Sequence, residues 1–254
     1  MGEQTTESTS SFRYSRFGLI VTGECEEAHL PHLFRCLMAA GNCTFNIVRR
    51  IRQRDSRGPR RELKMVGEGK KIPDRDQNEI GIPVRIFLNN NQDSFVLLID
   101  DLEQNRRKEV ENILKRYRTA LDVMLLDRKR RASVHFLANM LEAYFYADPK
   151  SVKEALGLEL EEFKGDVEDI RNPKADLKKV FPGYNEIRDG GEVLRRLDAE
   201  SVLSDPGTCA FLRTLFAWCT RALRKDFTDK FQLRNGNMSD VTGIQLSGDY
   251  DPGQ

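Results

Sequence analysis

The sequence contains few of the residues that build a structural zinc site or a disulfide framework. Only three of its 254 residues are histidine, and neither a Cys-x-x-Cys pair nor a His-x-x-x-His pair occurs. Structural zinc sites are usually built from such pairs, so the sequence does not predict one. Five cysteines without a regular spacing indicate reduced thiols, which are typical of the cytoplasm. We therefore expect a cytoplasmic protein.

Long apolar runs and an excess of one charge are also missing. No segment is apolar over enough residues to cross a bilayer, so we expect no membrane partner. Residues 1–11 are polar and lack the apolar core of a signal peptide. The 41 basic residues nearly balance the 40 acidic ones, which gives a formal net charge of +1. Bulk charge therefore indicates neither a protein that coats nucleic acid nor an acidic tail.

Apolar segments that alternate with helical patterns predict an α/β fold. Residues 16–22 and 44–48 are strand candidates, and apolar side chains recur at helical spacing between them. A strand, a helix and a strand in this order form the first crossover of a parallel sheet. Residues 95–99 are an uninterrupted apolar run, as in a strand buried on both faces of such a sheet. Later elements are predicted as a helix at 104–121, a strand at 132–137 and helices at 140–147, 151–156 and 206–227.

These elements predict a mostly parallel central sheet, flanked by helices, in a main domain of residues 16–150. Residues 151–230 are charged and punctuated by proline and glycine, and we expect a helical C-terminal region there. Residues 1–15 and 231–254 are polar and predicted to be disordered tails.

Acidic residues follow two of the predicted strands. Glu24 and Glu26 come after the first strand, whereas Asp100, Asp101 and Glu103 come directly after residues 95–99. In parallel sheets, ligands bind beyond the carboxyl ends of the strands, and carboxylates suit Mg²⁺ or Mn²⁺. The alternative is that these acids only cap helices, because carboxylates also favour the positive end of a helix dipole. If the two strands are neighbours, the sequence predicts a site for metal-dependent phosphodiester cleavage.

In that hypothesis each acid has a role. Asp100, Asp101 and Glu103 bind the metal ion, with Asp101 also counted as catalytic, and Glu24 or Glu26 acts as a ligand or a general base. Glu142 lies in the apolar segment 140–147, where an unpaired charge is costly. We expect it either to pair with a cation or to reach the metal site.

Basic residues gather in residues 49–75, together with glycine and proline. This composition predicts a long flexible loop, and long loops within compact domains are often functional. Clustered arginines attract the phosphate backbone of DNA or RNA. A solvated loop, or a surface for an acidic partner, stays open as an alternative. The candidate nucleic-acid contacts are Arg49, Arg50, Arg52, Arg54, Arg60 and Arg61.

The acidic motifs resemble those of TOPRIM proteins. Val21-Thr-Gly-Glu-Cys-Glu26 and Asp100-Asp-Leu-Glu103 are similar to the two motifs of OLD- and RloB-type TOPRIM nucleases. The segment Asn139-Met-Leu-Glu-Ala-Tyr-Phe-Tyr-Ala-Asp-Pro149 looks like the signature of a TOPRIM-related bacterial family, the domain of unknown function 4276 family. Further likeness lies in Asn172-Pro-Lys174, Tyr184, Cys209, Phe211 and Trp218.

The resemblance covers most of residues 16–226 and implies a TOPRIM-like sheet and a metal-dependent nuclease subunit. Family members are often found beside ATPases in anti-phage defence islands, so it also implies an ATPase partner. One departure is Thr22, which stands where the first motif usually has a glutamate. That departure favours an alternative, a non-catalytic regulator or sensor that works with an ATPase. Metal-dependent chemistry on a small nucleotide is a third hypothesis, which needs the acids but not the basic loop.

Overall fold

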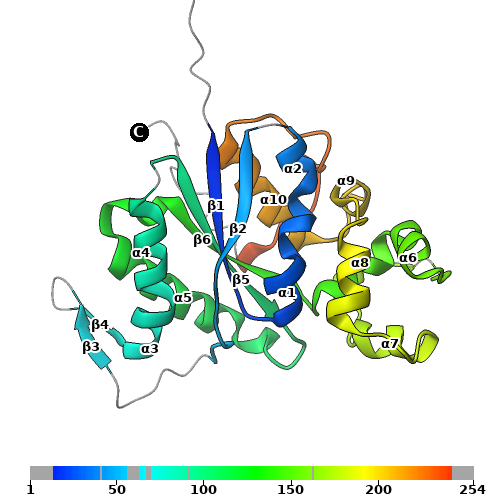
Figure 1. Cartoon of the computed structure of the whole chain (residues 1–254), viewed down its shortest axis with the longest axis horizontal. Helices are drawn as coiled ribbons and strands as arrows, with labels where there is room; N and C mark the ends of the chain where they lie inside the picture. The colour runs from blue at the N-terminus through cyan, green and yellow to red at the C-terminus, as the bar shows by residue number, and fades with distance from the viewer. Residues whose placement is uncertain are drawn as a thin grey trace, which may run out of the picture.

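The computed structural model describes residues 14–40, 42–55, 63–66, 70–90, 92–161 and 163–241. Its centre is a four-stranded sheet with the order β2-β1-β5-β6, in which every neighbouring pair is parallel. The strands are β1 (Ser15–Val21), β2 (Cys43–Arg50), β5 (Ser94–Leu102) and β6 (Ala132–Ala138). Helices cover both faces of this sheet (Figure 1), so the predicted α/β fold with a parallel sheet flanked by helices is confirmed.

Each face of the sheet has its own apolar core because side chains alternate along a strand. On one face, Phe17 of β1 stacks on Phe45 of β2 at 4.5 Å between ring centroids, and Phe34 stacks on the other side of Phe45. This core is covered by α1 (Glu24–His29), a 3-10 helix (Leu30–Phe34), α2 (Arg35–Ala39) and α10 (Ala210–Leu223). The opposite core lies under α4 (Ile82–Asn89) and α5 (Val110–Leu125).

The basic segment 49–75 is more ordered than an irregular loop in the part that the structure describes. It contains an antiparallel hairpin of β3 (Leu63–Val66) and β4 (Lys70–Pro73), which leads into α3 (Asp74–Asp76). Arg54 is only 2% exposed, and its guanidinium pairs with Asp76 at 2.7 Å. A buried charge needs such a partner, and this ion pair fixes the chain where it leaves β2. A π-helical turn (Gln77–Gly81) then joins α3 to α4.

The C-terminal region is built mainly of short helices. They are α6 (Pro149–Leu156), α7 (Pro173–Val180), α8 (Gly191–Leu194) and α9 (Ala199–Val202), followed by α10. The predicted helix at 140–147 is a 3-10 helix, Leu141–Ala147, rather than an α-helix. It starts after Asn139 and Met140, whose φ angles of 55° and 77° lie in the left-handed region. Two such residues force a sharp turn at the end of β6.

Part of the predicted disordered tail packs against the helices. Phe231 is fully buried, and residues up to 241 are described. Arg213 of α10 is also fully buried and donates hydrogen bonds to backbone carbonyls, namely those of Leu203, Asp205, Thr208, Phe231 and Asn237. These carbonyls satisfy a buried guanidinium and hold the C-terminal segment in place. Most of the predicted N-terminal tail, residues 1–13, lies outside the described residues.

No helix within the described ranges is both long and apolar enough to cross a membrane.

Candidate functional site

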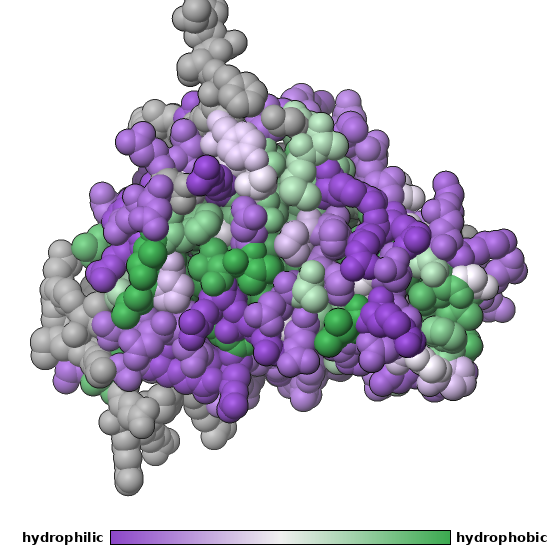
Figure 2. Space-filling view, in the orientation of Figure 1, coloured by the Kyte–Doolittle hydropathy of each residue, from purple (hydrophilic) through white to green (hydrophobic). Residues whose placement is uncertain are grey.

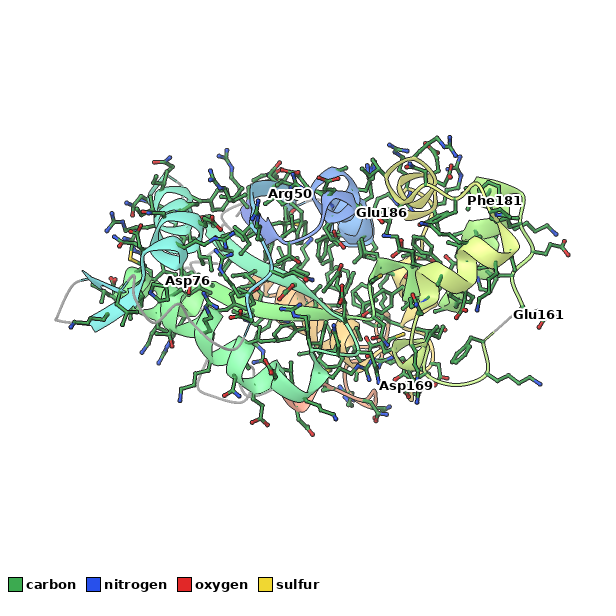
Figure 3. The ribbon with its side chains drawn as sticks, turned by 90° about the horizontal axis from the view of Figure 1, so that it is seen from below. Arg50, Asp76, Glu161, Asp169, Phe181 and Glu186 are labelled. Atoms are coloured by element: carbon green, nitrogen blue, oxygen red, sulfur yellow. The ribbon has the colours of Figure 1, made fainter. Side chains whose placement is uncertain are left out.

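The candidate site lies at the carboxyl ends of β1 and β5, which are neighbours in the sheet. Val21 is in register with Ile99, so the residues that follow these two strands emerge side by side. Figure 3 looks at this edge from below and shows Arg50 between Asp76, on the α3 side, and Glu186, on the side of the C-terminal helices. The predicted convergence of the two strand ends is therefore found.

Gly23 lets Glu26 turn back over the end of β1. It precedes α1 as its N-cap, and a side chain there would place a Cβ atom 1.7 Å from Oε2 of Glu26. The Glu26 carboxylate thus occupies the space that a larger residue would fill. Glu26 is only 5% exposed although it belongs to the first turn of a helix. Its burial directs a carboxylate toward the sheet edge rather than into solvent.

Asp100 is enclosed by hydrogen-bond donors on the α5 face. Its Oδ1 atom accepts from the Thr22 hydroxyl at 2.9 Å, and its Oδ2 atom accepts from the Tyr117 hydroxyl at 2.9 Å. Arg106 adds an ion pair at 2.7 Å to Oδ2 and a longer hydrogen bond to Oδ1. Both oxygens of this fully buried carboxylate are engaged, which is how a protein compensates a buried charge.

Asp101 points to the opposite face because successive side chains of a strand alternate. Its Oδ1 atom is buried and has no hydrogen-bond donor among the described residues. Burial raises the pKa of Asp101 well above its usual value, and the nearby carboxylates of Glu26, Asp100 and Glu142 raise it further. The Glu26 carboxylate is the strongest of these neighbours and lies within hydrogen-bonding contact. Two acids that share one small space attract either a proton or a cation.

Glu142 joins the two acids from the third strand end. The turn at Asn139 and Met140 brings the 3-10 helix back over the sheet edge, and Glu142 on it is buried. Burial and the Glu26 carboxylate raise the pKa of Glu142, whereas Lys174 and a hydrogen bond from the Tyr184 hydroxyl oppose that rise. Glu142 therefore lies beside the other acids, and Lys174 is near enough to lower its pKa although the ion pair of Lys174 is with Glu186. A place of Glu142 in a metal site stays a prediction.

Two residues of the C-terminal region that were given no role from sequence reach this site. Lys174 of α7 pairs with Glu186 and lies close enough to Glu142 to lower its pKa. The Tyr184 hydroxyl donates to Glu142 at 3.2 Å and sits beside Gly190, where a Cβ atom would come within 2.7 Å of it. Lys174 belongs to Asn172-Pro-Lys174, one of the segments in which the sequence resembles the TOPRIM-related family. That resemblance is the sequence signal by which Lys174 could have been found.

The thiol of Cys25 completes this side of the site. It donates to the backbone carbonyl of Glu186 at 3.3 Å. Burial, followed by the charges of Glu26, Glu142 and Asp101, raises the pKa of Cys25 far above that of a free thiol. A thiol held in this neutral form is a poor nucleophile, so the chemistry of the site rests on its carboxylates.

The donor set fits a hard divalent cation held by few protein ligands. Among the described residues, no group of three or more His, Cys, Asp and Glu side chains is placed to hold a metal ion together. Mg²⁺ usually keeps several waters and binds through one or two carboxylates. Asp101 and Glu26 supply that number of carboxylates, and no described donor engages the Oδ1 atom of Asp101.

The family model described as Domain of unknown function (DUF4276) matches residues 21–215, which include both strand ends, Glu142 and Lys174. The chain belongs to this family. No curated protein and no solved structure matches the chain. The acids that the fold brings together, Glu26, Asp101 and Glu142, therefore lie within the matched region of a DUF4276 protein, as does Asp100.

The other predicted site acids of this DUF4276 protein lie apart from the cluster of Glu26, Asp101 and Glu142. The side chain of Glu24 is 61% exposed and pairs with Arg50 at 2.7 Å, on the outer side of α1. Glu103 is half-exposed where the chain leaves β5, and its carbonyl accepts from the backbone of Arg106. A catalytic role for Glu24 and a metal-binding role for Glu103 stay predictions.

The predicted nucleic-acid contacts divide into four groups. Arg54 is buried in its pairs with Asp76 and Glu79, so its guanidinium does not face solvent. Arg50 is half-exposed and bridges Glu24 and Glu27. Arg49 and Arg52 are exposed. Arg60 and Arg61 lie outside the described residues.

Proposed function

We propose that this DUF4276 protein is a nuclease that hydrolyses phosphodiester bonds of DNA or RNA with the help of Mg²⁺ or Mn²⁺. The observation that carries the proposal is the contact between Glu26 and Asp101, two acids from neighbouring strand ends, with Glu142 beside them. Acids gathered in one place raise one another's pKa and destabilise a fold, so their presence points to a function, even with Lys174 near Glu142. We also propose that the sheet and these motifs are related to the TOPRIM proteins.

In this proposal Asp101 and Glu26 hold the cation, because their oxygens meet at the partly exposed end of β5. When bound, the cation lowers the pKa of a coordinated water and offsets the charge of the phosphate. The Tyr184 hydroxyl orients Glu142, and in this proposal Glu142 accepts a proton from the attacking water. Asp100 is not a ligand in this scheme, because Thr22, Tyr117 and Arg106 already engage it.

Lys174 is the cation of this site that a substrate could reach. It is partly exposed and stands beside Glu142, so it can contact the phosphate that is cleaved and stabilise the added negative charge. Arg52, which is exposed just beyond the end of β2, binds phosphates further along the strand in this proposal. Such contacts give affinity without sequence preference.

The test is hydrolysis of single- and double-stranded DNA and RNA by the purified chain in Mn²⁺ or in Mg²⁺. Asp101→Asn removes a proposed ligand of the cation and should abolish most of the hydrolysis. Glu142→Gln removes the proposed general base and should lower the rate by about 10²–10⁴-fold. Lys174→Gln should lower it while leaving metal binding intact. Activity that survives in Asp101→Asn means that a contaminant or another site cuts the substrate, and the proposal is then wrong.

A second candidate is the non-catalytic regulator or sensor that works with an ATPase. The observation that favours it is Thr22, which stands where the TOPRIM motif usually has a glutamate and whose hydroxyl donates to Asp100. The site then keeps its acids for structure or for a bound cation without hydrolysis. Metal binding without cleavage of any nucleic acid, also in the presence of an ATPase encoded beside it, supports this candidate over the nuclease.

A further inference from the structure

We propose that the open edge of β2, with the groove beside it, binds an extended acidic segment of a partner protein, which adds a strand to the sheet. β2 is the first strand in the sheet order and pairs with β1 on one side. No other described strand pairs with its outer side. Exposed strand edges offer a row of backbone donors and acceptors that an added strand can use.

A groove of about 500 Å³ lies next to this edge, between β2 and α4. Its apolar lining comes from Ile47, Val48, Ile82, Pro83, Ile86 and Phe87. Ile86 is 54% exposed, which is unusual for an isoleucine in the middle of a helix. Figure 2 shows the apolar surface gathered between α4 and the β2 edge. Such a surface supplies pockets for the alternate side chains of an added strand.

The groove depends on two local features of the sheet. Gly18 of β1 lacks a side chain, and a Cβ atom there would lie 2.6 Å from Val48 and 2.9 Å from Phe87. Phe87 can therefore pack against β1 at Gly18, and it lines the groove. The second feature is a bulge, because the register between β1 and β2 shifts after Leu19, which pairs with Ile47, to Ile20, which pairs with Arg49. Val48 is the extra residue, and bulges of this kind re-aim side chains next to binding sites.

The charge at the groove selects the partner. Arg49 lines the groove and is exposed, and no ion pair neutralises it within the described ranges. Its neighbour Arg50 is already bound by Glu24 and Glu27. The remaining polar lining, Asn78 and Asn90, is neutral. An apolar groove with one free positive charge therefore fits a segment in which apolar and polar residues alternate and an acidic residue stands at one end.

Two other occupants fit less well. A second copy of the chain would bring its own Arg49 to the same edge, and the described lining of its groove contains no acid to pair with it. A nucleic acid would find one cation above an apolar floor, whereas phosphate backbones need several cations. An extended acidic segment can pair with the backbone edge of β2, pack on the apolar lining and form an ion pair with Arg49 at the same time.

The experiment is selection of a phage-displayed library of random dodecapeptides on the full chain and on two folded variants. The peptides enriched on the wild-type protein should have apolar and polar residues in alternation and should contain Asp or Glu. Arg49→Glu should shift the enrichment to peptides with Lys or Arg, and Ile86→Asp should weaken the best wild-type peptide by about tenfold or more in fluorescence anisotropy. Hydrogen exchange of the β2 amides should slow when that peptide is bound. Thermal unfolding of each variant shows that it is folded.

Three results would overturn the proposal. The first is enrichment that does not respond to Arg49→Glu, because the selected peptides then bind elsewhere. The second is displacement of the peptide by a single-stranded oligonucleotide, which assigns the groove to nucleic acid. The third is a dimer in solution that Ile86→Asp separates, which assigns the groove to a second copy.

Discussion

Asp100 and Asp101 are consecutive residues at the end of one strand, yet their surroundings are opposite. Asp100 accepts hydrogen bonds from Thr22, Tyr117 and Arg106, and every oxygen of its carboxylate has a donor. Asp101 has a buried Oδ1 atom without a donor in the described part of the chain, and its neighbours are other acids. The first arrangement stabilises the fold, whereas the second destabilises it unless a proton or a cation is bound.

The difference comes from the alternation of side chains along β5. The Asp100 carboxylate lies on the α5 side of the sheet, where Thr22, which follows β1, and Tyr117 of α5 donate hydrogen bonds to it. The Asp101 carboxylate lies on the opposite side of the sheet, which faces α1 and the C-terminal region. Identical residues next to each other in sequence thus have different roles because neighbouring positions face different layers.

The largest expected effect is on stability, at Asp100. Asp100→Ala leaves the Tyr117 hydroxyl without its acceptor and the Arg106 guanidinium without its carboxylate, with only the carbonyls of Arg54 and Asp101 still accepting from it. We expect the free energy of unfolding to fall by about 3–5 kcal/mol, as for other buried ion pairs that lose one member. Urea unfolding measures it. A loss no larger than that of an exposed ion pair would show that Asp100 does not hold this face of the sheet together.

The next effect is stabilisation by the cation. Binding of Mn²⁺ to the folded chain at one hundred times its dissociation constant should raise the free energy of unfolding by about 2.7 kcal/mol. Removal of the ion with EDTA should reverse the rise. Asp101→Asn and Glu26→Gln should each reduce it, because they remove the proposed ligands, and Lys174→Gln should not. An equal Mn²⁺ effect in all these variants would place the ion elsewhere.

A smaller effect on the free energy of unfolding is expected from Asp101 itself when EDTA removes divalent cations. Its folded-state pKa is raised, so the folded chain binds the Asp101 proton more tightly than the unfolded chain does. The contribution to stability is therefore present below about pH 4, the ordinary value, and is lost as the pH rises through the folded-state pKa.

Asp101→Asn removes this pH dependence, and its amide can donate to Glu26. At pH 8 without metal the variant should be more stable than wild type by about 0.5–2 kcal/mol, the usual gain from removing an unfavourable group. The advantage should shrink at pH 5. A variant that is less stable than wild type at both pH values would contradict the placement of Asp101 among acids.

The smallest expected effect concerns a second pair of acids with opposite surroundings, Glu24 and Glu26, which are close in sequence on α1. Glu24 is exposed and pairs with Arg50, whereas Glu26 is buried beside Asp101. Glu24→Gln should leave nuclease activity and Mn²⁺ binding unchanged, and Glu26→Gln should lower both. The measurement is the same hydrolysis assay with both variants side by side. Equal losses would mean that Glu24 also takes part.

The sequence predicted the parallel sheet well because each strand carries its own local signal. The run at 95–99 is apolar on both faces, and the structure places it within β5 at the centre of the sheet. The convergence of Glu26 and Asp101 was predicted on the condition that the first and third strands are neighbours. The sheet order β2-β1-β5-β6 meets that condition, and the carboxyl ends of neighbouring parallel strands share one edge.

The rest depended on contacts that no local pattern reveals. The burial of Arg54 requires Asp76 and Glu79, which come more than 20 residues later and after a hairpin. The turn that delivers Glu142 uses Asn139 and Met140 at positive φ, where a glycine would have been the usual signal. Lys174 and Tyr184 reach the acids only through the packing of the C-terminal helices.

Arg213 has a practical consequence for anyone who shortens this chain. Its acceptors are neutral peptide groups rather than carboxylates, so high salt should leave the contact intact, while a stop codon before residue 231 would remove two of the five. The guanidinium would then be left inside the protein with too few partners. Trimming what resembles a dispensable tail is therefore a change to the interior of the molecule.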